Sequence, residues 1–282
     1  MQDITLQVHQ DDASAPCCGA QCSATDLLRW LGGSSDAAVT GALDSVVFPV
    51  LRIRAGQALM HQGAAFGCLY FVRAGAFKCS RTGLDGHEQV LSFAFQGDSI
   101  GFDGICGGSY GTTAVALEDA MVIAAPYVDI AAAAQHVPAL QHLLYDCASR
   151  DVKRSWASLE VVAAVGAEPR IVRFVLQLAA RHASLGYSGR HLRLPMSRRD
   201  IASHLGLAHE SVSRSLSSLK RSGCIHVRRR EVEIVDLAAL LDRQHASRRP
   251  ATSLPAKAAT PARAGVGTAA PQQGGVPHWA AH

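Results

Sequence analysis

Residues 197–235 constrain the fold of this chain more than any other stretch of the sequence. Ser197 is placed to cap a short helix, because its hydroxyl can accept a hydrogen bond from a free backbone N–H group at a helix start. Ile201 and Leu205 supply the apolar side of that helix. Gly206 follows where the chain must turn sharply, and glycine readily adopts the positive φ that such turns use. The stretch therefore opens with a short helix and a tight turn.

A second helix is expected over residues 209–220, because apolar residues recur there at helical spacing. These residues are Val212, Leu216 and Leu219. Two alternating runs follow, 224–228 and 231–235, with the basic tip Arg228-Arg229-Arg230 between them. Two helices joined by a tight turn and followed by a β-hairpin predict a winged helix-turn-helix.

The charge of the chain is divided unevenly along its length. Residues 190–230 hold ten Arg/Lys and two acidic residues, a net charge of +8. Residues 1–165 hold nine Arg/Lys and sixteen Asp/Glu, a net charge of −7. The overall net charge of +4 is therefore the sum of an acidic N-terminal part and a basic C-terminal part. A basic helix-turn-helix gains affinity for DNA by releasing counterions from the phosphates. The C-terminal half therefore predicts a nucleic-acid surface.

The outer face of the second helix offers side chains that can read base edges. Arg214 can donate two hydrogen bonds to guanine O6 and N7, and Glu210 can accept one from the amine of cytosine. An ordinary solvated helix is the alternative, but turn, wing and charge segregation together favour DNA recognition.

The pattern Glu210-x-x-Ser213-Arg214 resembles that of the CRP/FNR superfamily of bacterial transcription regulators, in its FNR branch. The resemblance implies a dimer that binds double-stranded DNA at a palindrome with TTGAT-like half-sites and that contacts RNA polymerase. It implies that Glu210, Ser213 and Arg214 contact bases. The expected phosphate contacts are Ser211, Arg198, Lys220, Arg221, Arg228, Arg229 and Arg230.

Residues 43–125 show short alternating runs punctuated by glycines, which suits a small barrel or jelly roll. The expected strands are 46–53, 58–60, 68–74, 76–81, 89–95, 113–117 and 120–125. This part resembles the cyclic-nucleotide-binding β-roll of the same superfamily, so the resemblance spans about residues 40–240. The fold class is therefore expected to be α+β, with an N-terminal β-roll (a cyclic-nucleotide-binding-like jelly roll), a long dimerisation helix and a C-terminal winged helix-turn-helix.

The resemblance also divides the chain into five parts. They are a flexible cysteine-containing segment (1–40), the β-roll sensor (41–126), the dimerisation helix (127–166), the DNA-binding domain (167–241) and a disordered tail (242–282). The tail is expected to be disordered because it is rich in Ala, Pro and Gly and has few large apolar residues.

Cyclic AMP is not expected to be the effector. Nucleotide-binding members use a Gly-Glu pair for the ribose and an Arg-Ser pair for the cyclic phosphate. Gly97-Asp98 and Gly111-Thr112 stand at these places. Without the arginine, no fixed cation offsets a buried phosphate, and an uncompensated buried charge is costly.

Three cysteines within six residues, Cys17, Cys18 and Cys22, lie where FNR-branch sensors carry ligands of a four-iron four-sulfur cluster. The family spacing is not kept, because Leu28 and Ile123 stand where further cysteines are expected, and Cys106 is the nearest substitute for the central ligand. A possible iron–sulfur cluster, a direct thiol switch and a cysteine-bearing segment without redox function all stay open. The expected input is oxygen or redox state.

The helix expected over residues 126–165 carries a weak heptad seam. The residues that fit it are Leu140, Leu144, Cys147, Val161 and Val165, while Asp151, Arg154 and Ser158 interrupt it. An ordinary amphipathic helix fits as well, and the expectation of a homodimer rests on the resemblance.

Several other classes are disfavoured by the sequence. It contains no phosphate loop or HExxH motif, so an enzyme is not expected and no catalytic residue is assigned. It has no apolar run long enough to cross a membrane and no signal peptide, so a cytoplasmic protein without membrane partners is expected. The alternatives are a regulator of the same architecture that senses heme, gas or another small ligand, and a constitutively active regulator without a cofactor.

Overall fold

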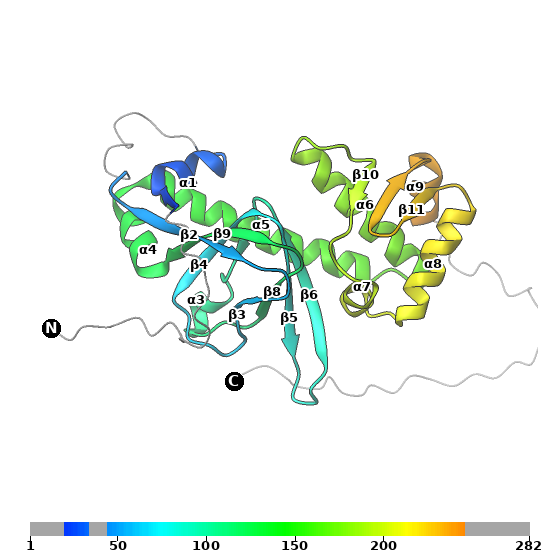
Figure 1. Ribbon diagram of the computed structural model, residues 1–282, viewed down its shortest axis with the longest axis horizontal. Helices are drawn as coiled ribbons and strands as arrows, with labels where there is room; N and C mark the ends of the chain where they lie inside the picture. Colours follow the sequence, from blue (N-terminus) through cyan, green and yellow to red (C-terminus); the bar gives the residue numbers. More distant parts are fainter. Residues whose placement is uncertain (1–19, 34–43, 246–282) are drawn as a thin grey trace, which may run out of the picture. The chain divides into compact units, whose positions relative to one another are not determined.

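The computed structural model describes residues 20–33 and 44–245 (Figure 1). It confirms the predicted α+β class, with antiparallel sheets in the N-terminal part, a long helix and a C-terminal helix-turn-helix followed by a hairpin. None of the described helices is both long enough and apolar enough to cross a membrane.

The β-roll consists of two antiparallel sheets, ordered β1-β2-β9-β4-β7 and β3-β8-β5-β6. Its strands are β1 (Gln21–Ser23), β2 (Val47–Ile53), β3 (Ala58–Met60), β4 (Cys68–Ala74), β5 (Ala76–Thr82), β6 (Glu88–Phe95), β7 (Ser99–Ile100), β8 (Thr113–Ala116) and β9 (Ala120–Pro126). The seven strands expected from alternation are all present. Phe48, Leu69, Phe71 and Ile123 fill one core of the roll, and Phe77 and Val122 belong to another. Gly86, at a φ of 78°, turns the β5–β6 hairpin.

The prediction of a flexible segment over residues 1–40 is wrong for residues 20–33. Residues 21–23 form β1, which pairs with β2, and α1 (Ala24–Trp30) follows. Ser23 caps α1 by accepting a hydrogen bond from the N–H of Asp26 at 3.0 Å. Leu27 and Leu28 are fully buried, and burial of these leucines stabilises the segment against the roll.

The single helix expected over 127–166 is two helices, α4 (Tyr127–His136) and α5 (Pro138–Val162). Pro138 causes the break, because proline has no N–H and disfavours the helical conformation of the residue before it. Val137 accordingly has φ −127° and ψ 96°, an extended conformation. A short helix, α3 (Gly104–Gly107), follows β7.

The expected seam of α5 is also wrong. Leu140, Cys147 and Val161 are buried within the chain itself, and Leu140 and Cys147 pack in a core with Leu27 and Ile130. A different row of apolar residues is exposed along α5: Tyr145, Val152, Trp156 and Leu159. Their spacings of seven, four and three residues are those of the d and a positions of a heptad.

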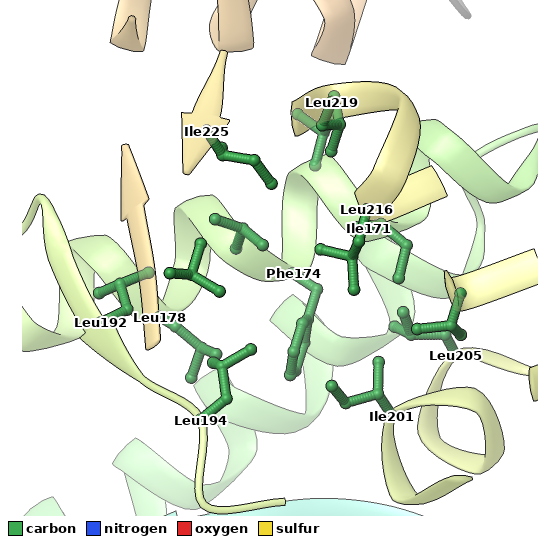
Figure 2. Close-up of a cluster of buried hydrophobic side chains, with 14 of the residues drawn as sticks. Ile171, Phe174, Leu178, Leu192, Leu194, Ile201, Leu205, Leu216, Leu219 and Ile225 are labelled. Atoms are coloured by element: carbon green, nitrogen blue, oxygen red, sulfur yellow. The ribbon is translucent and has the colours of Figure 1, made fainter. Parts of the chain in front are cut away.

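The C-terminal part comprises α6 (Ala167–Ser184), β10 (His191–Arg193), α7 (Arg198–Leu205), α8 (His209–Arg221), β11 (Ile225–Arg228), β12 (Glu231–Ile234) and α9 (Leu237–His245). Phe174 of α6 lies among apolar side chains from α7, α8 and the small sheet β10-β12-β11 (Figure 2). The predicted tail begins too early, because residues 242–245 belong to α9. The remainder of the predicted tail lies outside the described residues.

Candidate nucleic-acid interface

The helix-turn-helix has the local structure expected from its sequence. Ser197 accepts a hydrogen bond from the N–H of Asp200 at 3.1 Å, and the Asp200 carboxylate accepts one from the N–H of Ser197 at 2.9 Å. This reciprocal capping box fixes the start of α7. Gly206 ends the helix at a φ of 61°, a conformation that costs glycine little. Arg170 of α6 donates to the carbonyl of Leu205 at 2.9 Å and so ties the turn to the rest of the domain.

α8 separates a buried side from an exposed side. Val212, Leu216 and Leu219 are buried in the domain core. Glu210 and Arg214 are exposed one helical turn apart, and Ser213 beside them is half-buried, with its hydroxyl donating to the carbonyl of His209 at 3.3 Å. Neither Glu210 nor Arg214 forms an ion pair with another residue of 20–33 or 44–245. Their charged groups are therefore available to an external ligand.

The wing is a hairpin whose tip is basic. Arg228 pairs with Glu231 across the β11–β12 ladder, which leaves Arg229 and Arg230 as the loop. Arg229 has a φ of 53°, the single positive φ of a non-glycine residue in the described chain. Such a backbone costs about 1–3 kcal/mol and is commonly retained where the residue has a function. All three arginines of the tip are exposed.

The other predicted phosphate contacts differ in exposure. Lys220 and Arg221 are exposed at the end of α8, whereas Ser211 is half-buried near its start. Arg198 is half-buried, and one of its Nη atoms has no hydrogen-bond partner among the described residues. Burial lowers the pKa of Arg198 below its ordinary value. DNA contact by any of these residues stays a prediction.

Of the four cysteines predicted for redox chemistry, the structure describes Cys22 and Cys106. Cys22 is 4% exposed in β1, and burial, followed by the nearby charge of Asp26, raises the pKa of its thiol. A buried thiol with a raised pKa is a poor target for a direct thiol reaction, and a redox role for Cys22 stays a prediction. Cys106 is exposed on α3, while Cys17 and Cys18 lie outside the described residues. Within 20–33 and 44–245, no three His, Cys, Asp or Glu side chains are grouped to hold a metal ion.

A cavity of about 630 Å³ lies between the β-roll and α5. Phe93, Phe102, Asp103, Thr112, Asp151 and Arg154 are among the residues that line it. Thr112 donates to the carboxylate of Asp103 at 3.1 Å. Asp98, which stands at the expected ribose-binding position, is already paired with Arg154 and Arg181. A sugar hydroxyl would have to compete with these arginines for the Asp98 carboxylate, and no local sequence pattern indicates this pairing.

Comparison with known proteins covers both parts of the fold. The Crp-like helix-turn-helix domain model matches residues 169–243, and the cyclic nucleotide-binding domain model matches residues 50–136. These segments contain α7, α8 and the wing in one case, and most of the β-roll together with α4 in the other.

Relatives match the two parts together. The transcriptional regulatory protein btr of Bordetella pertussis is 35% identical over 198 residues, which is 70% of this chain and 82% of that protein. The anaerobic regulatory protein of Pasteurella multocida is 31% identical over 200 residues, or 71% of this chain and 73% of that one. The structure of FixK2 from Bradyrhizobium japonicum superposes with a TM-score of 0.64 at 24% identity, covering 70% of this chain and 97% of FixK2, and shows the same fold.

Proposed function

Because the chain belongs to the CRP/FNR superfamily of transcription regulators, we propose that it binds a palindromic, TTGAT-like site on double-stranded DNA as a homodimer. The relatives are regulators of transcription and not enzymes. The observation that carries the proposal is the exposed face of α8, where Glu210 and Arg214 project from the first turns of the helix without partners among the described residues.

Each side chain of this face has a chemical role in the proposal. Arg214 donates two hydrogen bonds to a guanine, Glu210 accepts one from the paired cytosine, and Ser213 contacts an adjacent base or phosphate. The phosphate contacts come from Lys220, Arg221 and the three wing-tip arginines, with Arg198 and Ser211 at the helix starts. Base contacts give sequence preference, whereas phosphate contacts give affinity that falls with salt.

The exposed row of α5 supports the homodimer. Trp156 and Leu159 are 63% and 66% exposed, and Tyr145 and Val152 continue the row toward the N-terminus of α5. A heptad row of this kind is buried when two copies of a helix pack against each other. We place the dimer contact on this row, in place of the seam that the sequence suggested. Contact with RNA polymerase is also part of the proposal, and it rests on membership of the superfamily.

The input signal is proposed to be oxygen or redox state. The similarity to the anaerobic regulatory protein of Pasteurella multocida supports this, as does the run of cysteines near the N-terminus. Among the described residues no three His, Cys, Asp or Glu side chains are grouped, so an iron–sulfur cluster would need ligands from outside them. An absorbance spectrum and an iron assay on protein purified without oxygen test whether the protein holds an iron–sulfur cluster. If the protein is colourless and free of iron but binds DNA, the redox input is a thiol reaction.

The cavity beside α5 favours a second input, a small ligand. Its volume of about 630 Å³ is that of a typical ligand site, and it has both apolar and charged lining residues. A Soret band on the purified protein would indicate heme. If neither a cofactor nor a ligand alters DNA binding, the protein is constitutively active.

Fluorescence anisotropy with two labelled duplexes tests the DNA-binding proposal. One duplex carries the TTGAT palindrome, and the other has the same composition in scrambled order. The full chain should prefer the palindrome by about 10³-fold or more, and the affinity for both duplexes should fall steeply with salt. Equal affinity for the two duplexes would overturn the proposed sequence specificity.

A further inference from the structure

Asp98 connects three segments that are far apart in the sequence. It lies in the turn between β6 and β7, is 5% exposed, and accepts a hydrogen bond from the N–H of Phe95 at 2.9 Å. Its Oδ1 forms an ion pair with Arg154 of α5, and its Oδ2 lies 2.6 Å from Nη2 of Arg181 in α6. One carboxylate of the β-roll therefore binds the long helix and the first helix of the DNA-binding domain.

The same turn holds Arg181 by further contacts. The guanidinium of Arg181 lies over the ring of Phe95, 5.3 Å from its centroid, and Nη2 donates to the carbonyl of Gln96 at 3.4 Å. Tyr187, just beyond α6, donates its hydroxyl to Oε1 of Gln96 at 3.3 Å. Stacking on an aromatic ring together with an ion pair fixes the direction of the planar guanidinium.

Asp98 compensates the charge of both arginines, and Arg181 depends on it most. Burial lowers the pKa of Arg154 and that of Arg181 to about 10, so both side chains remain charged at neutral pH. Arg154 has a second carboxylate partner in Asp151, whereas Arg181 has an ion pair only with Asp98 among the described residues. Removing the Asp98 charge would leave Arg181 partly buried and uncompensated, which is strongly unfavourable.

A second contact attaches α7 to the edge of the β-roll. The hydroxyl of Ser203 accepts a hydrogen bond from the N–H of Val90 at 2.9 Å and donates one to the carbonyl of Glu88 at 3.1 Å. Nζ of Lys78 lies 3.0 Å from Glu88 and 3.1 Å from Asp200, a member of the capping box of α7. Val90 also packs in the core of the DNA-binding domain. Because α7 leads directly into α8, a fixed α7 sets the position of the proposed reading helix.

We propose that Asp98 is a positioning residue which, through Arg181 and Arg154, holds the DNA-binding domain on the β-roll and so sets the placement of α8 in the dimer. The consequence for DNA rests on the proposed function, whereas the attachment of the two domains does not. In a symmetric dimer, two reading helices must reach half-sites about one helical turn apart. If the DNA-binding domain were free to rotate on the β-roll, the two reading helices would adopt this separation less often. The protein would then discriminate less between DNA sites that differ in the distance between half-sites.

Amide hydrogen exchange at Val90 in the full-length chain tests the attachment directly, because its N–H is bound by Ser203 across the contact. The variants are Asp98→Asn and Arg181→Gln, the second of which leaves Asp98 and its bond to Phe95 in place. Glu118→Gln is the matched control, because Glu118 joins the same two domains through Arg193 at 3.0 Å, in an ion pair whose arginine is 65% exposed. Unchanged protection of the β4 and β9 amides will show that each variant is folded.

Exchange at Val90 should accelerate by about tenfold or more in Asp98→Asn and Arg181→Gln, since each change removes one partner of a buried ion pair. In Glu118→Gln it should stay within about twofold of the unmodified chain, as expected for a surface pair. Exchange at Val90 that is unchanged in both Asp98→Asn and Arg181→Gln would overturn the proposal.

DNA binding by the same proteins tests the consequence. The probes are the palindromic duplex and a version with two extra base pairs between the half-sites. The unmodified chain should prefer the first by about tenfold or more, and Asp98→Asn should reduce this ratio to about threefold or less. An unchanged ratio in Asp98→Asn would overturn the positioning role. If the unmodified chain does not distinguish the palindrome from scrambled DNA, the proposed function fails instead, and the exchange result still decides whether Asp98 attaches the domain.

Discussion

Replacing Leu159 by alanine should weaken the proposed homodimer. Leu159 is 66% exposed on α5, in the row that contains Val152 and Trp156. Complete burial of a leucine side chain contributes about 1.5–3 kcal/mol, so covering two-thirds of it gives about 1–2 kcal/mol. Because a two-fold axis places Leu159 of both protomers in the interface, the pair contributes about 2–4 kcal/mol to the free energy of dimerisation. Each 1.4 kcal/mol changes Kd tenfold, so the dimer Kd should rise by about 30-fold to 700-fold.

Sedimentation velocity over a range of protein concentrations measures this Kd. Leu84→Ala is a matched control, since Leu84 is also a leucine, is fully exposed, and lies in the β5–β6 turn away from α5. The control should dimerise like the unmodified chain. A dimer Kd in Leu159→Ala within about threefold of the unmodified value would refute the placement of the interface on this row.

Two further predictions concern the wing and α7. Arg229→Gly keeps a turn that needs a positive φ, so the unfolding temperature should not fall. The slope of log affinity against log salt should drop by about one unit for each protomer on DNA. An unchanged slope would exclude a phosphate contact by Arg229. Burial lowers the pKa of His204 below its ordinary 6.5. As the pH falls, the unfolded chain takes up a proton at this histidine before the folded chain does. The contribution of His204 to stability is therefore fully present above about pH 6.5 and is lost as the pH falls through the lower folded-state pKa. Urea midpoints measured at several pH values should show this decline in the unmodified chain. The decline should be weaker in His204→Gln and the same as in the unmodified chain in His226→Gln. If His204→Gln declines as much as the unmodified chain, other groups cause the decline.

Much of the fold could be predicted because its signals are local. The β-roll strands alternate apolar and polar residues between glycines, and the strands β3 and β4 begin and end where the pattern predicted. The helix-turn-helix was predictable for the same reason, since the Ser197 cap, Gly206 and the apolar spacing of α8 all lie within one short stretch.

The remainder depends on contacts between distant residues. β1 has three residues and exists because β2 is beside it, so Cys22 could not be recognised as buried from its own neighbours in the sequence. Helical spacing on α5 allowed more than one apolar stripe, and packing against α1 and α4 decides which one is covered. The pairing of Asp98 with Arg181 joins residues 83 positions apart, which no local pattern encodes.

The claim that α8 reads DNA is tested most directly by one base substitution in each half-site. Affinities of the unmodified chain and of Arg214→Ala are measured on the palindrome and on a duplex in which the G·C pair of both half-sites is replaced by A·T. The unmodified chain should lose about 1–3 kcal/mol per half-site on the altered duplex, whereas Arg214→Ala should bind the two duplexes nearly equally. If Arg214→Ala still discriminates between them as strongly as the unmodified chain, Arg214 does not read that base pair and the account of this interface is wrong.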